Sequence, residues 1–593
     1  MHSLRAASVA LAFLLAVSSL DGCGVAVPPE APASGPADYL VRTDLSGTPG
    51  GNLIIPLASD PRTFNRLISF DYAGRVISEL LSSDLVRVNR VSFDLEPSLA
   101  SRWELDNDGR TYTIHLRRGL RFSDGVPLTA EDVVFTFQVL QDPKINSSSA
   151  DLLKVDGVFP TVTQADSHTI RLAFPRPLGM GLRTLDSLTI LPRHRLLRAF
   201  QEGKLSSTWG PASSPEDLVG TGPFRLRAYQ PGVKVVLERN PHYWKKDKTG
   251  QTLPYLDTLT FLIVPDRNAQ ALRFLSGELD LLDYQSVEPE NFTALRRASS
   301  QGQFILKDLG PGLALDFLWF NLNPGRTGSG KPYVDPEKRA WFEKAQFRRA
   351  VALALDRPGM TRAIFLGLGT PQDGPVSTGN RAWHNDGLPP VEFRPSTAKE
   401  LLAQLGLRDT DGDGILEFGP GRPFEFTLLT VRGNSRREKM VQVARENLAR
   451  IGIRVEAELV EMRELIHKLA DSFEYEAMLF GFTPSDVAPE NLADLWLSSG
   501  SNHFWFPNQA HPQSAWETEI DQLTSRLMRS LDPAARKKAF FEIQEIWARE
   551  MPAIPTIAPN VLVAWKTKVG NVRPAILAPH LYWNAEELTV RGR

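Results

Sequence analysis

The alternation of strand-like and helix-like segments along 593 residues constrains the fold more than any other feature. Residues 111–117 alternate apolar and polar side chains, so Tyr112, Ile114 and Leu116 share one face of a predicted strand. Thr129 then opens a predicted helix, because a capping hydroxyl followed three residues later by an acid satisfies the free N–H groups of a first turn. Strands that alternate with helices predict an α/β protein of packed sheet and helix layers.

The same alternation continues toward the C-terminus. Ser435 and Glu438 have the spacing of a capping box and predict a helix that ends at Gly452. Residues 453–457 then resume a strand pattern. Asp532, which a proline follows, predicts the start of another helix. The chain shows no internal repeat, so these elements belong to a large globular body.

The N-terminus predicts export. A short basic region is followed by an apolar run of about 15 residues that ends before residue 22. This run is too short to span a bilayer and is typical of a signal peptide, which we expect over residues 1–22. Cys23 follows, and Leu20 to Cys23 resembles the lipobox of bacterial lipoproteins, although Asp21 departs from the usual small neutral residue. We expect lipidation at Cys23, with a plain cleaved signal peptide as the alternative, and a flexible, lipid-anchored tether over residues 23–50.

Composition excludes several classes of protein. The formal net charge is −2, and acids and bases are mixed along the chain, so no basic stripe points to nucleic acid. Cys23 is the only cysteine, which rules out an internal disulfide. The sequence contains no His-Glu-x-x-His pattern and no Gly-x-Ser-x-Gly elbow. We therefore expect no enzyme activity, no cofactor and no bound metal.

Two segments resemble known binding motifs but lack a residue that each motif requires. Asp409, Asp411 and Asp413 match the first half of a calcium loop, but the twelfth position is Pro420 instead of glutamate, so we expect a plain turn between a helix and a strand. Residues 325–331 resemble a phosphate-binding loop, yet residue 332 is proline where a magnesium-binding hydroxyl is required. Neither segment predicts a metal or nucleotide site.

Several segments in order resemble one family, the bacterial extracellular solute-binding proteins of family 5, which bind oligopeptides and dipeptides. The segments that carry the resemblance are residues 99–105, 116–125, 128–134, 220–224, 240–244, 253–257, 271–280, 317–322 and 347–357. Each is weak alone, but together they run in the family's order from about Asn52 to Pro574.

The resemblance implies a two-lobed fold of the periplasmic binding protein type (type II, with an extra subdomain) that closes on a ligand between its lobes. We expect Gly220, Gly222 and Pro223 to suit a crossing between lobes, where the chain must turn sharply. The expected division is lobe I over residues 51–86, 222–310 and 553–593, the extra subdomain over 87–221, and lobe II over 311–552.

The resemblance also implies ligand-binding residues. In peptide-binding relatives an aspartate in a loop pairs with the peptide's terminal ammonium, and the matching loop here contains Phe482, Ser485 and Asp486. Asn502 and Trp505 lie in a later segment where relatives carry a turn that lines the cleft. Trp383 is a further candidate.

The function implied is that of a monomeric solute-binding component of an ABC uptake transporter in the periplasm or cell envelope. It would bind a short peptide and deliver it to a membrane permease. Two alternatives stay open: the same fold binding a non-peptide solute, such as an oligosaccharide, a metal chelate or an opine-like molecule, and an envelope chaperone or sensor.

Overall fold

The computed structural model describes residues 38–591, apart from residues 70, 146, 148, 149, 151, 152, 156, 187 and 420. The predicted signal peptide and Cys23 lie outside the described residues, and so does most of the predicted tether. Residues 37–593 form one compact unit, which we describe by itself. Among its described residues, no helix is both long and apolar enough to cross a bilayer.

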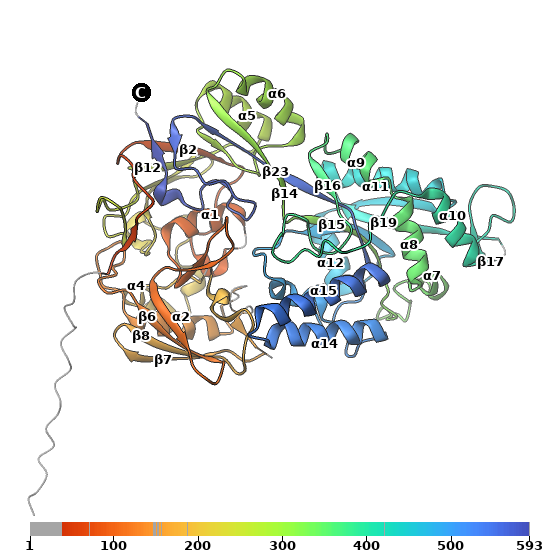
Figure 1. Ribbon diagram of the computed structural model, residues 1–593, viewed down its shortest axis with the longest axis horizontal. Helices are drawn as coiled ribbons and strands as arrows, with labels where there is room; N and C mark the ends of the chain where they lie inside the picture. The colour runs from red at the N-terminus through yellow and green to blue at the C-terminus, as the bar shows by residue number, and fades with distance from the viewer. Residues whose placement is uncertain are drawn as a thin grey trace, which may run out of the picture. The chain divides into compact units, whose positions relative to one another are not determined.

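One part of this unit, which we call lobe I, is built on two four-stranded sheets around a shared apolar core (Figure 1). The strands of the first sheet are, in order, β2 (Asn52–Leu57), β12 (Thr258–Ile263), β10 (Lys234–Arg239) and β9 (Phe224–Gln230). Those of the second sheet are β5 (Ala100–Leu105), β6 (Thr111–Leu116), β8 (Thr169–Ala173) and β7 (Thr161–Asp166). The helices of lobe I are α1 (Tyr72–Leu81), α2 (Ala130–Gln141), α4 (Arg193–Gln201), α5 (Arg267–Ser276) and α6 (Pro289–Ser299).

The other part, lobe II, is built on one mixed five-stranded sheet. Its strands are, in order, β20 (Arg454–Val460), β19 (Glu425–Val431), β21 (Ala477–Phe482), β15 (Leu315–Phe320) and β22 (Ala553–Pro555). All six residues of β15 are buried, because apolar clusters pack on both faces of the sheet. The helices that pack in these clusters include α8 (Ala345–Ala354), α10 (Pro395–Gln404), α11 (Ser435–Ala449), α14 (Ala515–Arg529) and α15 (Pro533–Glu550).

A long strand is shared between the lobes. β23 (Ile557–Lys566) begins against β16 (Gly369–Pro371) and ends against β13 (Leu281–Leu282), while β14 (Phe304–Pro311) runs antiparallel beside it (Figure 1). Its first residues belong to the cores of lobe II and its later ones to the core of lobe I. The chain therefore crosses between the lobes along β14 and β23.

The expectation that Gly220, Gly222 and Pro223 form a crossing between the lobes is wrong. These glycines lie within lobe I, where a Cβ on Gly220 would stand 2.0 Å from the carbonyl oxygen of Leu81. The amide of Gly222 donates to the same carbonyl. The glycines are needed because two backbones approach closely, which leaves no room for a side chain.

Two helix starts test the capping predictions. Thr129 caps α2 with the reciprocal bonds of a capping box, as predicted. The predicted box at Ser435 is wrong by one residue, since Asn434 is the cap and its side chain accepts from the amide of Arg437 at 3.1 Å. Glu438 instead accepts from the amide of Gly433. The sequence alone does not separate the two positions, because asparagine and serine are comparably good caps.

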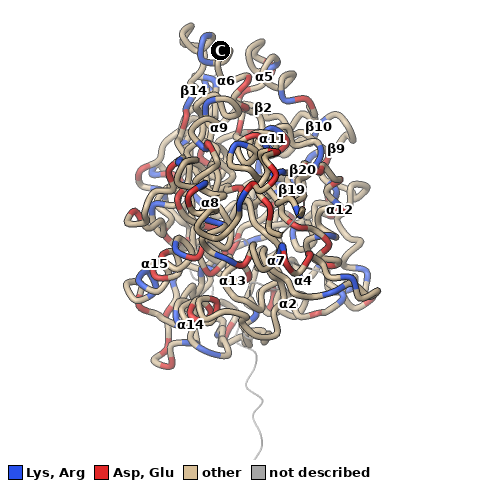
Figure 2. Tube along the Cα trace, turned by 90° about the vertical axis from the view of Figure 1, so that its right-hand side faces the viewer, with Lys and Arg blue, Asp and Glu red and all other residues tan. Residues whose placement is uncertain are grey.

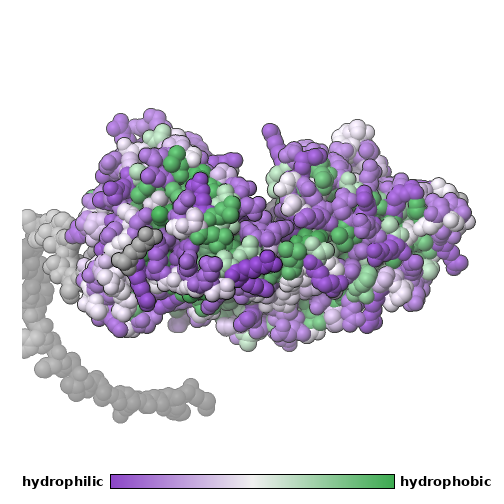
Figure 3. All heavy atoms as spheres, turned by 90° about the horizontal axis from the view of Figure 1, so that it is seen from above, coloured by the Kyte–Doolittle hydropathy of each residue, from purple (hydrophilic) through white to green (hydrophobic). Residues whose placement is uncertain are grey.

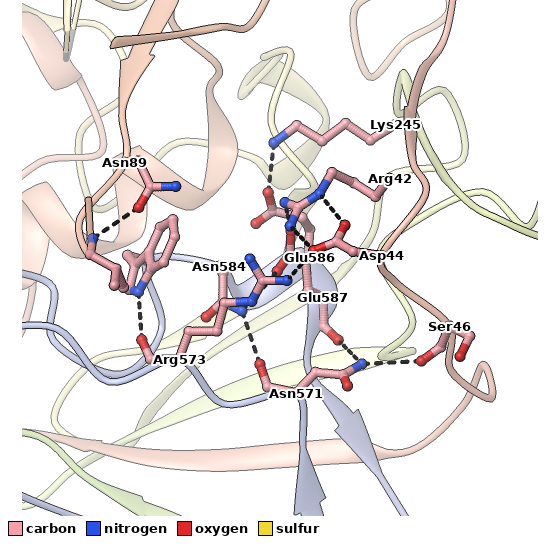
Figure 4. A network of polar contacts seen from close by, with 12 residues as sticks. Arg42, Asp44, Ser46, Asn89, Lys245, Asn571, Arg573, Asn584, Glu586 and Glu587 are labelled. Atoms are coloured by element: carbon pink, nitrogen blue, oxygen red, sulfur yellow. Dashed lines mark hydrogen bonds and ion pairs between the residues drawn. The ribbon is translucent and has the colours of Figure 1, made fainter. Parts of the chain in front are cut away.

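The C-terminal segment is fixed to lobe I by buried ion pairs (Figure 4). Glu586 accepts from Lys245 at 2.7 Å and from Arg87 at 2.9 Å. Glu587 is fully buried and pairs with Arg42. Burial alone would raise the pKa of Glu586, but the two cations outweigh it and hold that pKa below its usual range. Segments from the start, middle and end of the chain thus meet in one network.

Charged residues elsewhere are distributed without segregation. Over the face in Figure 2, Lys and Arg are interspersed with Asp and Glu. This matches the mixed charge along the sequence, and exposed pairs of this kind contribute little to stability.

Candidate functional site

Asp486 lies just beyond the end of β21, in the loop that the resemblance singled out. It is 6% exposed, and its Oδ1 accepts from the amide of Val487 at 2.7 Å. Because Phe482, the last residue of β21, pairs with Leu315 of β15, the loop leaves the sheet beside a buried strand. The backbone therefore holds this carboxylate in a defined position.

The partner of Asp486 comes from the other lobe. Arg183, in a short 3₁₀-helix over Gly181–Leu185, pairs with both carboxylate oxygens, and its Nη2 stands 2.5 Å from Oδ1. Its Nη1 donates to the carbonyl of Phe93 at 2.6 Å, which holds the guanidinium from the lobe I side. The pair is a bidentate, charge-assisted contact between lobes.

The neighbouring acid is already engaged within lobe I. Asp186, which ends the same 3₁₀-helix, pairs with Arg90 at 3.0 Å and accepts from the amide of Val88 at 2.8 Å. Asp486 is therefore the carboxylate partner of Arg183, and Asp186 is that of Arg90.

An apolar cluster with members from both lobes lies close to the ion pair. Its buried members are Val88, Leu313, Val487 and Leu577, and Phe93, Leu95, Trp383 and Ile576 pack against them. Val487 and Phe93 are bound directly to the ion pair through their backbone groups. The surroundings of the pair are thus poor in water, which strengthens the attraction between its charges. On the face in Figure 3 the surface is hollowed between the lobes, with apolar residues on both sides.

A small cavity of about 30 Å³ lies beside Asp486. Its lining is mainly apolar and includes Leu313, Phe482, Pro484, Val487, Trp496 and Phe540. Asn380 also lines it, is 8% exposed and donates to the carbonyl of Val487 at 2.8 Å. Among the described residues, the Oδ1 of Asn380 has no hydrogen-bond partner. The cavity has room for one or two waters or a small ligand group.

The predicted residues Phe482 and Ser485 lie near Asp486. Phe482 is half-buried and stacks on Phe317, with ring centroids 6.0 Å apart, while Ser485 is exposed. Trp383 is half-buried, lies edge-on to Phe540 and has the guanidinium of Arg536 over its ring. These three residues stay predicted ligand contacts.

Trp505 packs in the same apolar cluster of lobe II as Phe482 and Trp383. Trp505 is 1% exposed, and its indole N–H donates to Glu517 of α14 at 3.1 Å. Asn502 is exposed. The structure thus brings Asp486 and Phe482 to one cavity, whereas Trp505 is buried in the core against α14.

Sequence reasoning missed Arg183 and Asn380. Neither stands in a motif, and Arg183 is 303 residues from its partner. It also missed a second charged cluster, in which Arg437 binds Asp316 through its Nε at 2.9 Å and its Nη2 at 2.7 Å. Asp316 is 3% exposed and lies opposite Gly481 on β15. This cluster fixes the start of α11 against the same end of the sheet as Asp486.

Lobe I contains a polar cavity of about 90 Å³. Its lining includes Arg66, Asp84, Arg90, Tyr243 and Glu586. Burial raises the pKa of Asp84 to about 7, although Arg66 opposes the shift. The complete lining carries four basic side chains (Arg66, Arg87, Arg90 and Lys245) and three acidic ones (Glu79, Asp84 and Glu586).

The acidic turn at residues 409–417 brings four carboxylates together. Ligand oxygens of Asp409, Asp411, Asp413 and Glu417 lie within 4.8 Å of one another. Asp409 accepts from the amides of Gly412 and Gly414, and the other three also bind amides of the turn. Such bonds are those of a self-capped turn, so the geometry alone assigns no metal.

Comparisons with known proteins agree with the two-lobed fold. The family profile "Bacterial extracellular solute-binding proteins, family 5 Middle" matches residues 94–504. A probable ABC transporter-binding protein of Deinococcus radiodurans is 26% identical over 91% of this chain and 92% of its own length. The oligopeptide-binding protein AppA of Bacillus subtilis is 28% identical over 86% of this chain and 87% of its own length.

The solved structure of that AppA in complex with a nonapeptide superposes with a TM-score of 0.69 at 25% identity. The superposition covers 92% of this chain and the whole of the other. The expected two-lobed architecture is therefore confirmed, and a binding protein rather than an enzyme is the class to which it points. Together with the profile match over most of the chain, this similarity means that the protein belongs to the bacterial extracellular solute-binding proteins of family 5.

Proposed function

We propose that the chain binds short peptides between its lobes and delivers them to the permease of an ABC uptake transporter. The observation that carries this proposal is the full-length similarity to AppA, a protein whose solved structure holds a nonapeptide. The relative from Deinococcus radiodurans, named for ABC transport, supports the transporter partner.

Asp486 is the proposed contact for the peptide's terminal ammonium. A nearly buried carboxylate that is held by its own backbone makes a strong, charge-assisted contact with a cation. Phe482 and the apolar cavity beside it would receive a small adjacent side chain. Ser485, Trp383 and Asn502 complete the proposed set of ligand contacts, whereas Trp505 packs in the core of lobe II and donates its indole N–H to Glu517.

The cell envelope is the proposed location. A lipid on Cys23, followed by the Pro- and Ala-rich tether, would keep a monomeric binding protein close to the permease. The lobe boundaries proposed from the sequence, with an extra subdomain over residues 87–221, belong to this proposal. Incorporation of labelled palmitate into the wild type but not into Cys23→Ala is the expected result, and equal labelling would contradict it.

The function is tested by native mass spectrometry of protein purified from the cell envelope. We expect co-purified peptides in the wild type and fewer in Asp486→Asn. Asp386→Asn is the matched control, because the side chain of Asp386 is 99% exposed. A co-purified oligosaccharide or metal chelate would replace the peptide proposal with a non-peptide solute. Binding of unfolded proteins in place of small molecules would favour a chaperone.

A further inference from the structure

We propose that Arg183 is a specificity-determining residue that competes with the ligand's ammonium group for Asp486. The inference rests on the proposed function and concerns the same site. Its basis is that the chain supplies its own cation, from the opposite lobe, to the carboxylate that a peptide would use.

The geometry leaves little room for a second cation. The Nε and Nη2 atoms of Arg183 each face one oxygen of Asp486, and the amide of Val487 donates to Oδ1 as well. The side chain of Asp486 is only 7% exposed. An ammonium group can therefore reach these oxygens only if the guanidinium moves away.

Arg183 is anchored so that it competes effectively. The carbonyl of Phe93 accepts from Nη1, so donors on both edges of the guanidinium are bound. Within the described part of the chain, Asp486 provides the carboxylate of its ion pair, since Asp186 is held by Arg90. A displaced Arg183 would lose a bidentate contact without gaining an equivalent one nearby.

The position of the pair couples specificity to closure. Arg183 belongs to lobe I and Asp486 to lobe II, and the apolar cluster around Val88 and Val487 also has members from both. The amide of Gly179, four residues before Arg183, donates to the carbonyl of Met528 of lobe II at 2.7 Å. The pair therefore stabilises the closed state when no peptide is bound. It also lowers the net free energy gained when a peptide with a free amino terminus binds.

Peptide capture measures the competition. A synthetic pool of random pentapeptides, and the same pool after N-acetylation, is passed over immobilised full-length protein, and the retained peptides are quantified by mass spectrometry. Arg183→Gln should retain the free pool about tenfold more than the wild type, the order expected for one charge-assisted hydrogen bond. Retention of the acetylated pool should not rise, because an acetylated terminus gains no ion pair with Asp486 and the interlobe contact is lost. Arg183→Lys keeps the charge but loses the bidentate geometry. It should retain an amount of the free pool between those retained by the wild type and by Arg183→Gln.

Arg198→Gln is the matched control, because it removes the same charge from an arginine whose side chain is 90% exposed. It should retain both pools as the wild type does. Equal or weaker retention of the free pool by Arg183→Gln would overturn the inference, and so would an equal gain for both pools.

Small-angle scattering without peptide gives a readout that does not depend on the ligand. Arg183→Gln should have a larger radius of gyration than the wild type and Arg198→Gln, because an interlobe contact is lost. An unchanged radius would refute the coupling to closure. If no variant retained peptides while Arg183→Gln still expanded, the peptide function and the competition would both be refuted, and only the interlobe contact would stand.

Discussion

Glu517 allows a quantitative prediction, because a buried carboxylate there is surrounded by donors. It lies in the first turn of α14 and is 4% exposed. One oxygen accepts from Gln509 at 2.8 Å and from the indole of Trp505 at 3.1 Å, and His503 approaches it at 3.3 Å. The other oxygen accepts from the hydroxyl of Ser514 at 2.8 Å. These bonds favour the charged form of the carboxyl group.

The pKa of Glu517 measures their contribution. Burial would raise it, but the hydrogen bonds prevail and lower the pKa from its ordinary 4.5 to about 2. At about 1.4 kcal/mol for each pKa unit, the charged form stabilises the fold by about 3 kcal/mol at pH 7. Because the folded pKa is the lower one, this contribution is complete above pH 4.5 and is lost as the pH falls toward 2.

Glu517→Gln is the perturbation, since glutamine keeps the shape but not the charge. We expect its free energy of unfolding to be about 3 kcal/mol lower at pH 7 and only about 1 kcal/mol lower at pH 3. Urea denaturation followed by tryptophan fluorescence measures both, with Glu519→Gln as the control. Glu519 lies on the same helix, 57% exposed, 4.0 Å from Arg549. The reasoning would be refuted if Glu517→Gln and Glu519→Gln lost the same free energy of unfolding. It would also be refuted if the difference between Glu517→Gln and the wild type did not decrease from pH 7 to pH 3.

Two further predictions concern lobe II. Gly481→Ala should lower the free energy of unfolding by about 1–3 kcal/mol, because its Cβ would stand 2.1 Å from the carbonyl oxygen of Leu315 on the paired strand. Gly210→Ala, with no atom within 4 Å, is the control, and equal stability of both variants would contradict the prediction. Calcium chloride at about 1 mM should leave the melting temperature unchanged, because the loop lacks the twelfth-position glutamate of a calcium loop. A rise that Asp411→Ala abolishes would show a calcium site.

Local features of the fold followed from the sequence because their causes are local. The cap at Thr129 and the alternation over residues 111–117 involve residues within one turn or one strand. The cap of α11 was misassigned by one residue, because Asn434 and Ser435 compete for the same role. The sequence also contained the family's segments in their usual order, and this resemblance predicted the two-lobed architecture.

The candidate site was only partly predictable. The position of Asp486 in its loop came from resemblance, whereas no pattern marked Arg183 or Asn380. Trp505 illustrates the difficulty: an indole next to a predicted cleft segment looks the same in sequence whether it faces a ligand or the core. Here its N–H is bound by Glu517, and its ring is almost completely buried.

The sequence alone determined the alternation of strands and helices, the export signal as a prediction, and the family resemblance. All of these arise from residues that are near one another in the chain or from their linear order. The tertiary structure alone decided that β23 is shared by the lobes and that Arg183 meets Asp486 across 303 residues. Such pairings depend on where packed sheets bring distant loops, and side-chain periodicity carries no information about that distance.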